Sequence, residues 1–369
     1  MNLKKIVFVI LISLLGGILG FFLFQKLYLQ QSLISPLVDR TILKKELPLQ
    51  AYTIKNLQKQ NFPSRQPIII KELIEEDNQI YKLLFFYHSQ GKNISGALNV
   101  ALSMSNLTQK QTVTAPVIIM IRGWAPKENY YTGLGTKNAA QAFAQAGFVT
   151  LAPDFLGYGQ SDDDLIDNWE ARFIKPINII DLINAVNNFP EIIIPEELGL
   201  NVEKIVLQPK IAIWAHSNGG QIAITTLEIL NQGIPSSLWA PVTAPFPYSI
   251  IFYSDEQDDE GKEMRQYLSI FERDYDVFDF SITKHLDSLY GPLQIHHGAR
   301  DLEAPIAWSE DFINKIEEEN LKRSELNEKE LIDYSYYRYE NADHNLQGNW
   351  QTAINRDLLF FKENLELNN

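Results

Sequence analysis

The chain has 369 residues, of which 45% are apolar and 21% charged, a composition that supports one large folded core. Its formal net charge of −14 gives no electrostatic footprint for nucleic acid, whose phosphates need clustered lysine and arginine. The absence of cysteine excludes disulfides, thiol nucleophiles and zinc–thiolate sites.

The amino terminus predicts a membrane anchor. Residues 6–24 carry no charge after Lys4 and Lys5, and as a helix they would span roughly 28 Å. The run ends in large apolar residues instead of the small ones of a cleavage site, which favours an uncleaved anchor over a signal peptide. We therefore expect a single-pass transmembrane anchor over 1–26. Because so short a tail generally stays inside, the rest of the chain is expected to be extracytoplasmic.

Residues 27–65 are rich in Gln, Lys and Leu without a sustained period, which predicts a tether. From residue 66 to 369, strand-like and helix-like runs alternate, and this pattern is typical of an α/β domain with a mostly parallel sheet flanked by helices. The first three strands follow one another without helices, so the sheet should open antiparallel. The expected strands cover 68–74, 81–88, 94–102, 117–121, 148–152, 211–214, 238–242, 293–297 and 334–339. The expected helices cover 136–146, 176–189, 218–231, 305–320 and 350–365.

One insertion, residues 245–291, interrupts this alternation and is rich in aromatic residues. It could form a satellite core under a long excursion. In this topology, however, an insertion after that strand lies over the carboxyl edge of the sheet, where ligands bind. The sequence therefore predicts a lid.

A short strand, Ile211–Trp214, leads into the small residue Ala215 and then Ser217, which is followed by Gly219 and Gly220. Small residues let the backbone turn sharply, and the turn exposes a serine hydroxyl to a base. An ordinary loop or helix start remains an alternative for this string alone. Glycine is usual at the position of Ala215, and alanine is its mildest replacement.

A serine nucleophile needs a base and an orienting acid, which follow it along the chain in this topology. His344 is the one histidine in a loop after the last strand. Asp301 follows the strand at 293–297 and is the expected acid, with Glu303 as the fallback. A turn or helix-capping role is the structural alternative for Asp301.

The segment from residue 66 to 369 resembles an α/β-hydrolase. The loop Pro153–Ser161 resembles that of the superfamily after its fourth strand, and the glycines after Ser217 with the segments 298–305 and 342–344 look most like the catalytic domain of the prolyl oligopeptidase family. Dienelactone-hydrolase-like esterases are similar too. The resemblance implies that Ser217 is the nucleophile, His344 the base and Asp301 its partner.

The same resemblance implies an oxyanion hole made by the amides of Asn218 and Trp124, with Arg122 standing where a histidine is common. It implies no metal and no organic cofactor. Prolyl oligopeptidases usually carry a β-propeller, which the residues ahead of the domain are too few to form. A peptide and an ester therefore both remain candidate substrates, and a non-catalytic binding module on the same fold is the competing function.

Overall fold

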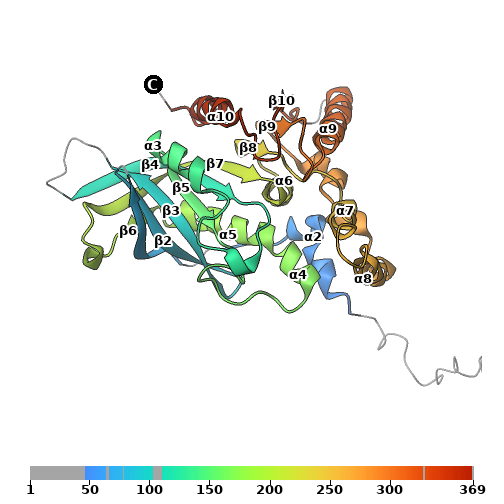
Figure 1. The fold of residues 1–369 in the computed structure, drawn as a ribbon, viewed down its shortest axis with the longest axis horizontal. Coiled ribbons are helices and arrows are strands. Elements are labelled where there is room, and N and C mark those ends of the chain that lie inside the picture. The colour runs from blue at the N-terminus through green and yellow to red at the C-terminus, as the bar shows by residue number, and fades with distance from the viewer. Residues whose placement is uncertain (1–45, 64–65, 78, 103–109, 327–328, 368–369) are drawn as a thin grey trace, which may run out of the picture. The chain divides into compact units, whose positions relative to one another are not determined.

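The computed structural model describes residues 46–63, 66–77, 79–102, 110–326 and 329–367. In this part of the chain, a twisted central sheet carries helices on both faces (Figure 1). The strand order is β1-β2-β3-β5-β4-β7-β8-β9-β10, and β6 pairs with β7. The strands are β1 (Ile69–Asp77), β2 (Ile80–Ser89), β3 (Lys92–Ala101), β4 (Gln111–Ile121), β5 (Val149–Pro153), β6 (Glu191–Ile193), β7 (Val202–His216), β8 (Ser236–Trp239), β9 (Leu293–Gly298) and β10 (Tyr334–Tyr339).

The sheet opens antiparallel from β1 to β3 and becomes parallel from β5 to β10, as the sequence predicts. The strand β7 starts at Val202, earlier than expected, because it extends its pairing along β4 through a register shift. The short strand β6 pairs antiparallel with the same extension. It has three residues, too few to show a period in the sequence.

Apolar residues of the sheet pack against helices on each face. One face carries α5 (Lys175–Asn188), α6 (Asn218–Leu230) and α9 (Ile306–Leu326), and the other carries α3 (Lys137–Gln145) and α10 (Trp350–Asn364). The five helices expected from periodicity therefore exist. The short helix α4 (Asn168–Phe173) was not predicted; it begins at Asp167, whose side chain accepts hydrogen bonds from two backbone amides of its first turn.

The packed chain begins before residue 66. Residues Pro48–Tyr52 form the 3₁₀ helix η2 and Ile54–Leu57 form α2, and the side chains of Ile54 and Leu57 are buried in the main core. The Gln58 side chain also donates a hydrogen bond of 2.9 Å to the carbonyl of Glu228 in α6. The part of the expected tether nearest the domain is thus a packed element.

The expected anchor at 6–24 lies outside the described residues. Among those that are described, no helix has both the length and the apolar character needed to cross a membrane.

The insertion between β8 and β9 contains α7 (Tyr248–Ser254), α8 (Lys262–Asp274) and three 3₁₀ helices, η6 (Val277–Phe280), η7 (Ile282–Lys284) and η8 (Leu286–Ser288). Figure 1 shows α7 and α8 beside α4. Aromatic side chains of the insertion form a separate cluster with Trp169 and Phe173 of α4; Phe173 and Phe280 stack at 4.5 Å between ring centroids. The insertion is therefore a satellite core that is fixed to α4.

Candidate active site

Ser217 lies at a sharp turn between β7 and α6. Its backbone has φ 56° and ψ −125°, a conformation that residues other than glycine rarely adopt. The turn requires glycine twice: a Cβ on Gly219 would lie 2.2 Å from the carbonyl oxygen of Ile121, and one on Gly220 would lie 2.4 Å from Cβ of Pro241. The small residues therefore let α6 start directly behind Ser217, which is the elbow expected from the sequence.

Neighbouring strands hold this turn in place. The amide of Ser217 donates to the carbonyl of Trp239 at the end of β8 (2.9 Å), and the carbonyl of Ser217 accepts from the amide of Val242 (3.0 Å). Ala215 is fully buried in β7 opposite Ile121 and Leu238. A methyl group in place of the usual glycine hydrogen is thus accommodated in the strand.

His344 and Asp301 meet at the ends of β10 and β9. Nδ1 of His344 donates to Oδ2 of Asp301 over 2.8 Å, and the carboxylate is fully buried. Gly298 allows the two loops to meet, because a Cβ there would lie 2.3 Å from the carbonyl oxygen of Asp343. The side chain of Glu303 is 70% exposed, with Oε2 3.9 Å from Nε2 of His344. Asp301, and not Glu303, is therefore the carboxylate within hydrogen-bond distance of Nδ1.

Asp301 accepts more than one hydrogen bond. Its Oδ1 atom accepts from the amides of Glu303 and Ala304, each over 2.9 Å, so the capping role considered as an alternative coexists with the bond to His344. Burial acts to raise the pKa of this carboxyl, but the hydrogen bonds from two imidazoles and from the backbone outweigh it and hold the pKa well below its usual range. The carboxylate thus stays charged beside His344.

Two other histidines support this pair, and neither role was predicted from the sequence. Nε2 of His297 donates to Oδ2 of Asp301 over 3.0 Å, while its Nδ1 accepts from the Ser309 hydroxyl over 2.8 Å. Nε2 of His216 donates to the carbonyl of His344 over 3.0 Å. Burial and the nearby His344 lower the pKa of His216 to about 4, so it remains a neutral donor. No local sequence signal separates these histidines from ordinary strand residues.

The loop after β4 passes directly over Ser217. A Cβ on Gly123 would lie 2.9 Å from Cβ of Ser217, and Trp124 follows with a side chain that is 75% exposed. Asn218 is the first residue of α6, where an amide has no carbonyl of its own helix to bind. The backbone of Asn218 and that of Gly123, the residue before Trp124, therefore lie next to Ser217.

Arg122 anchors that loop. Its guanidinium donates to the carbonyls of Gly123 (2.9 Å) and Asp154 (2.8 Å), and lies 4.1 Å and 4.5 Å from the ring centroids of Tyr158 and Tyr130. A neutral imidazole has a single N–H donor and could not donate to both carbonyls, so these two hydrogen bonds explain the arginine at this position.

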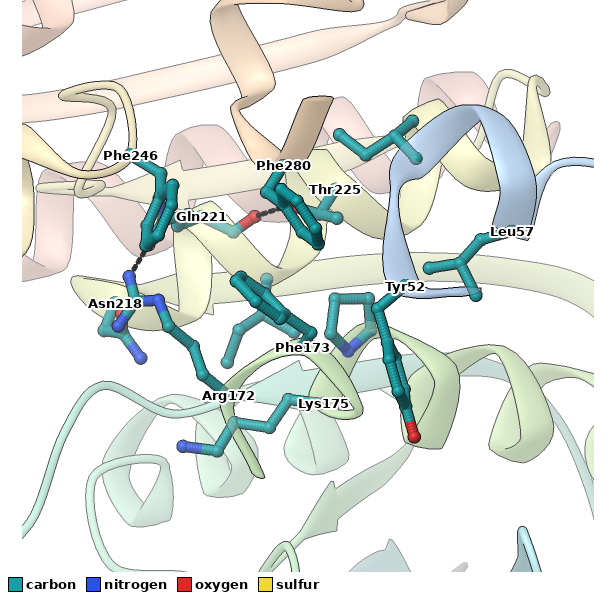
Figure 2. A pocket seen from close by; sticks show the side chains of 13 residues that line it. Tyr52, Leu57, Arg172, Phe173, Lys175, Asn218, Gln221, Thr225, Phe246 and Phe280 are labelled. Carbon is teal, nitrogen blue, oxygen red and sulfur yellow. Dashed lines mark hydrogen bonds between the residues drawn. The ribbon is translucent and has the colours of Figure 1, made fainter. Parts of the chain in front are cut away.

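A pocket borders the turn on the side of α4 and the insertion (Figure 2). Asn218 and Gln221 of α6 line it together with Arg172 and Phe173 of α4. A second, adjoining pocket shares Asn218 and Arg172 and is lined by Tyr253 of the insertion. Residues of the insertion thus line the space beside Asn218, and its role as a lid stays a prediction. In the described ranges, no group of three or more acidic or histidine side chains is placed to hold a metal ion.

Neither the protein-family models nor the curated protein sequences contain a match to this chain. Solved structures do match. An acetyl xylan esterase from Paenibacillus sp. R4 is 16% identical with a TM-score of 0.55, over 88% of this chain and 99% of its own. Acetyl xylan esterase 1 from Thermoanaerobacterium sp. JW/SL YS485 is 13% identical with a TM-score of 0.53, over 86% of this chain and 99% of its own.

A third solved structure, Porphyromonas gingivalis dipeptidyl peptidase 4, is 14% identical with a TM-score of 0.52, over 78% of this chain but 36% of its own. At such low identities the likeness concerns the fold. Together with the strand order and the turn at Ser217, these comparisons show that the chain has the α/β-hydrolase fold, as the sequence resemblance implied.

Proposed function

We propose that this protein is a serine hydrolase that cleaves acyl compounds through a covalent acyl-enzyme. The observation that carries the proposal is the strained turn at Ser217 combined with the buried pair of His344 and Asp301 at the ends of neighbouring strands. A turn of this kind presents a hydroxyl at the carboxyl edge of the sheet, and a carboxylate on Nδ1 leaves Nε2 of the imidazole as the base.

In the proposed mechanism, Nε2 of His344 takes the proton of the Ser217 hydroxyl while Oγ attacks the carbonyl carbon of the substrate. The backbone amides of Asn218 and Trp124 stabilise the oxyanion of the tetrahedral intermediate. His344 then gives its proton to the leaving group, and an acyl-enzyme remains. Water activated by His344 hydrolyses that ester, and Asp301 stabilises the imidazolium in both steps.

The leaving group can be an amine or an alcohol, because the same machinery serves both. The resemblance of the sequence to prolyl oligopeptidases favours a peptide. An ester is the second candidate, and a specific observation favours it: two acetyl xylan esterases match this chain over 99% of their own length, whereas the dipeptidyl peptidase matches over 36% of its length.

Labelling with a fluorophosphonate tests the nucleophile. We expect the wild-type protein to be labelled and Ser217→Ala to lose both labelling and turnover by several orders of magnitude. Ser269→Ala, on the exposed side of α8, is the matched control and should keep both. Undiminished turnover in Ser217→Ala would disprove the serine mechanism. A panel of peptides and esters on the wild-type protein then identifies the leaving group.

We also propose that residues 6–24 anchor the protein in a membrane with the hydrolase domain outside the cytoplasm. The uncharged run supports this proposal, since a helix of that length is held by burial of apolar surface and not by charge. The protein should then sediment with membranes and resist extraction by high salt or alkali. A mature amino terminus near residue 30 would instead identify a cleaved signal. Protease added to intact cells, with lysed cells as the control, tests the orientation.

A further inference from the structure

Two cationic side chains point into the pocket beside Asn218. Arg172 lies in the last turn of α4, and Lys175 is the first residue of α5. Figure 2 shows both side chains extending toward the same side of the pocket as Asn218, next to the proposed nucleophile. Aromatic side chains, among them Phe173 and Phe246, also line this pocket. The lining of the pocket therefore combines aromatic groups with two cations.

Neither cation has a counter-charge in the described part of the chain. Arg172 donates to the neutral side-chain oxygen of Gln221 over 2.6 Å, and Lys175 makes no hydrogen bond or ion pair with any described residue. Burial lowers the pKa of Arg172 to about 10. Burial and the neighbouring cations lower that of Lys175 to about 8. Holding two such charges together without a partner costs stability.

Most of the charged groups that act on Lys175 are positive. Arg122 and Lys127, from the loop after β4, repel Lys175, and Asp164, a described acid whose charge acts on it, is paired with Lys127 at 3.2 Å. This local excess of positive charge occurs in a chain whose net charge is −14. A general surplus of basic residues therefore does not explain the cluster.

Helix stability does not explain Lys175 either. The amino terminus of an α-helix carries a partial positive charge, so an acidic side chain stabilises the first turn and a lysine opposes it. Lys175 occupies the first position of α5, and no acidic residue lies in that first turn. The residue is thus unfavourable for the first turn of α5.

We propose that this pocket binds a carboxylate of the substrate, with Arg172 and Lys175 as the specificity-determining residues. The inference rests on the proposed function and deepens it. An arginine and a lysine that line one pocket can bind a carboxylate by charge-assisted hydrogen bonds, and a partly desolvated site strengthens them. The preferred substrates are then acyl compounds that carry a negative charge away from the bond that is cleaved.

Matched substrate pairs test this proposal. One pair places the charge on the acyl side, with mono-para-nitrophenyl adipate against para-nitrophenyl hexanoate. The other places it on the leaving group, with para-acetoxybenzoate against phenyl acetate. We expect kcat/KM of the wild-type protein to favour the anionic member of at least one pair by roughly ten-fold or more. Lys175→Gln and Arg172→Gln should each reduce that ratio toward one.

Lys55→Gln is the matched control, because Lys55 is an exposed lysine on α2 between two residues that line the pocket. It should retain the wild-type ratio. Equal or lower kcat/KM for both anionic esters, with hydrolysis that still depends on Ser217, would overturn the inference and leave the proposed function standing.

A binding measurement covers the case in which neither ester is cleaved. Calorimetry with adipate on Ser217→Ala should show binding that Lys175→Gln weakens roughly ten-fold. No binding of adipate, or binding that both cation variants leave unchanged, would overturn the carboxylate site. Failure of the wild-type protein to react with the fluorophosphonate would overturn the proposed function separately.

Discussion

Consecutive histidines of β9 meet buried carboxylates on opposite faces of the sheet. Successive side chains of a strand point to opposite sides. Nε2 of His296 donates to Oδ1 of Asp357 in α10 over 3.0 Å, and Nε2 of His297 donates to Oδ2 of Asp301 over 3.0 Å. Both pairs are fully buried. Two adjacent histidines thus each pair with a buried aspartate, and only the pair of His297 and Asp301 lies beside the candidate active site.

The two carboxylates differ in what else they bind. Asp357 accepts its remaining hydrogen bonds from side chains inside the core, namely Ser237, Trp239 and Gln294. Asp301 instead accepts from His344, which sits in a loop at the carboxyl edge of the sheet. The position at that edge, and not the presence of a buried histidine–carboxylate pair, therefore distinguishes the candidate catalytic group from a structural one.

The largest expected effect is on Asp301. Asp301→Asn should keep the geometry but favour the wrong tautomer of His344, so turnover should fall by about 10⁴-fold. Asp357→Asn, tested on the folded fraction, should change kcat/KM far less. Steady-state kinetics on both variants measures the contrast. Glu303→Gln is the matched control: a severe loss there with a near-silent Asp301→Asn would identify the other carboxylate.

Asp357→Ala should have the larger effect on stability. The variant leaves three buried donors and His296 without an acceptor, and we expect the free energy of unfolding to fall by about 3–5 kcal/mol. Urea unfolding followed by circular dichroism measures it. A loss below that of Asp301→Ala would show that the core pair is not the more structural of the two.

His297 is expected to act as a positioning residue for Asp301. His297→Phe removes one hydrogen bond from the carboxylate, which keeps its bonds to His344 and to two amides, so kcat should fall roughly ten- to a hundred-fold with KM unchanged. His297→Gln retains an amide donor and should restore part of kcat. If kcat fell equally in the two variants, and in proportion to their loss of stability, His297 would have a packing role alone.

Sequence patterns predicted the parts of this molecule that depend on local chemistry. The strand at Tyr334–Tyr339 has the predicted limits. The sharp turn at Ser217 forms because only residues as small as Gly219 and Gly220 permit the close approach of the neighbouring segments. The pairing of His344 with Asp301 followed from their places after successive strands.

Tertiary contacts determine what the sequence could not predict. The helix α4 has six residues, too short for a periodic pattern, and exists because its aromatic residues pack against the insertion. Arg172 was missed with it. His297 looked like any buried strand residue, since its partner is four positions away in a loop whose path the sequence does not give.

A third buried carboxyl, that of Glu228, lacks the hydrogen bonds that Asp301 and Asp357 accept. Glu228 of α6 is fully buried, and neither carboxyl oxygen has a hydrogen-bond partner in the described structure. Burial, with a contribution from Asp287, raises the pKa of Glu228 well above its usual range. The unfolded chain therefore loses this proton at lower pH than the folded chain does, so stability falls as pH rises above the unfolded pKa, until the folded pKa is passed.

Glu228→Met should consequently stabilise the protein, unlike changes to Asp301 or Asp357, because it removes an unsatisfied group and fills the same space. We expect a gain of about 1–3 kcal/mol in the free energy of unfolding at pH 8. The gain at pH 5 should be smaller, because the Glu228 carboxyl of the unfolded chain is less ionised there and folding then suppresses less ionisation. Urea unfolding at both pH values measures the difference. Glu272→Met, on the exposed side of α8, is the control and should change stability little at either pH. A loss of stability in Glu228→Met that is independent of pH would mean that this carboxyl has a partner as well matched as that of Asp357.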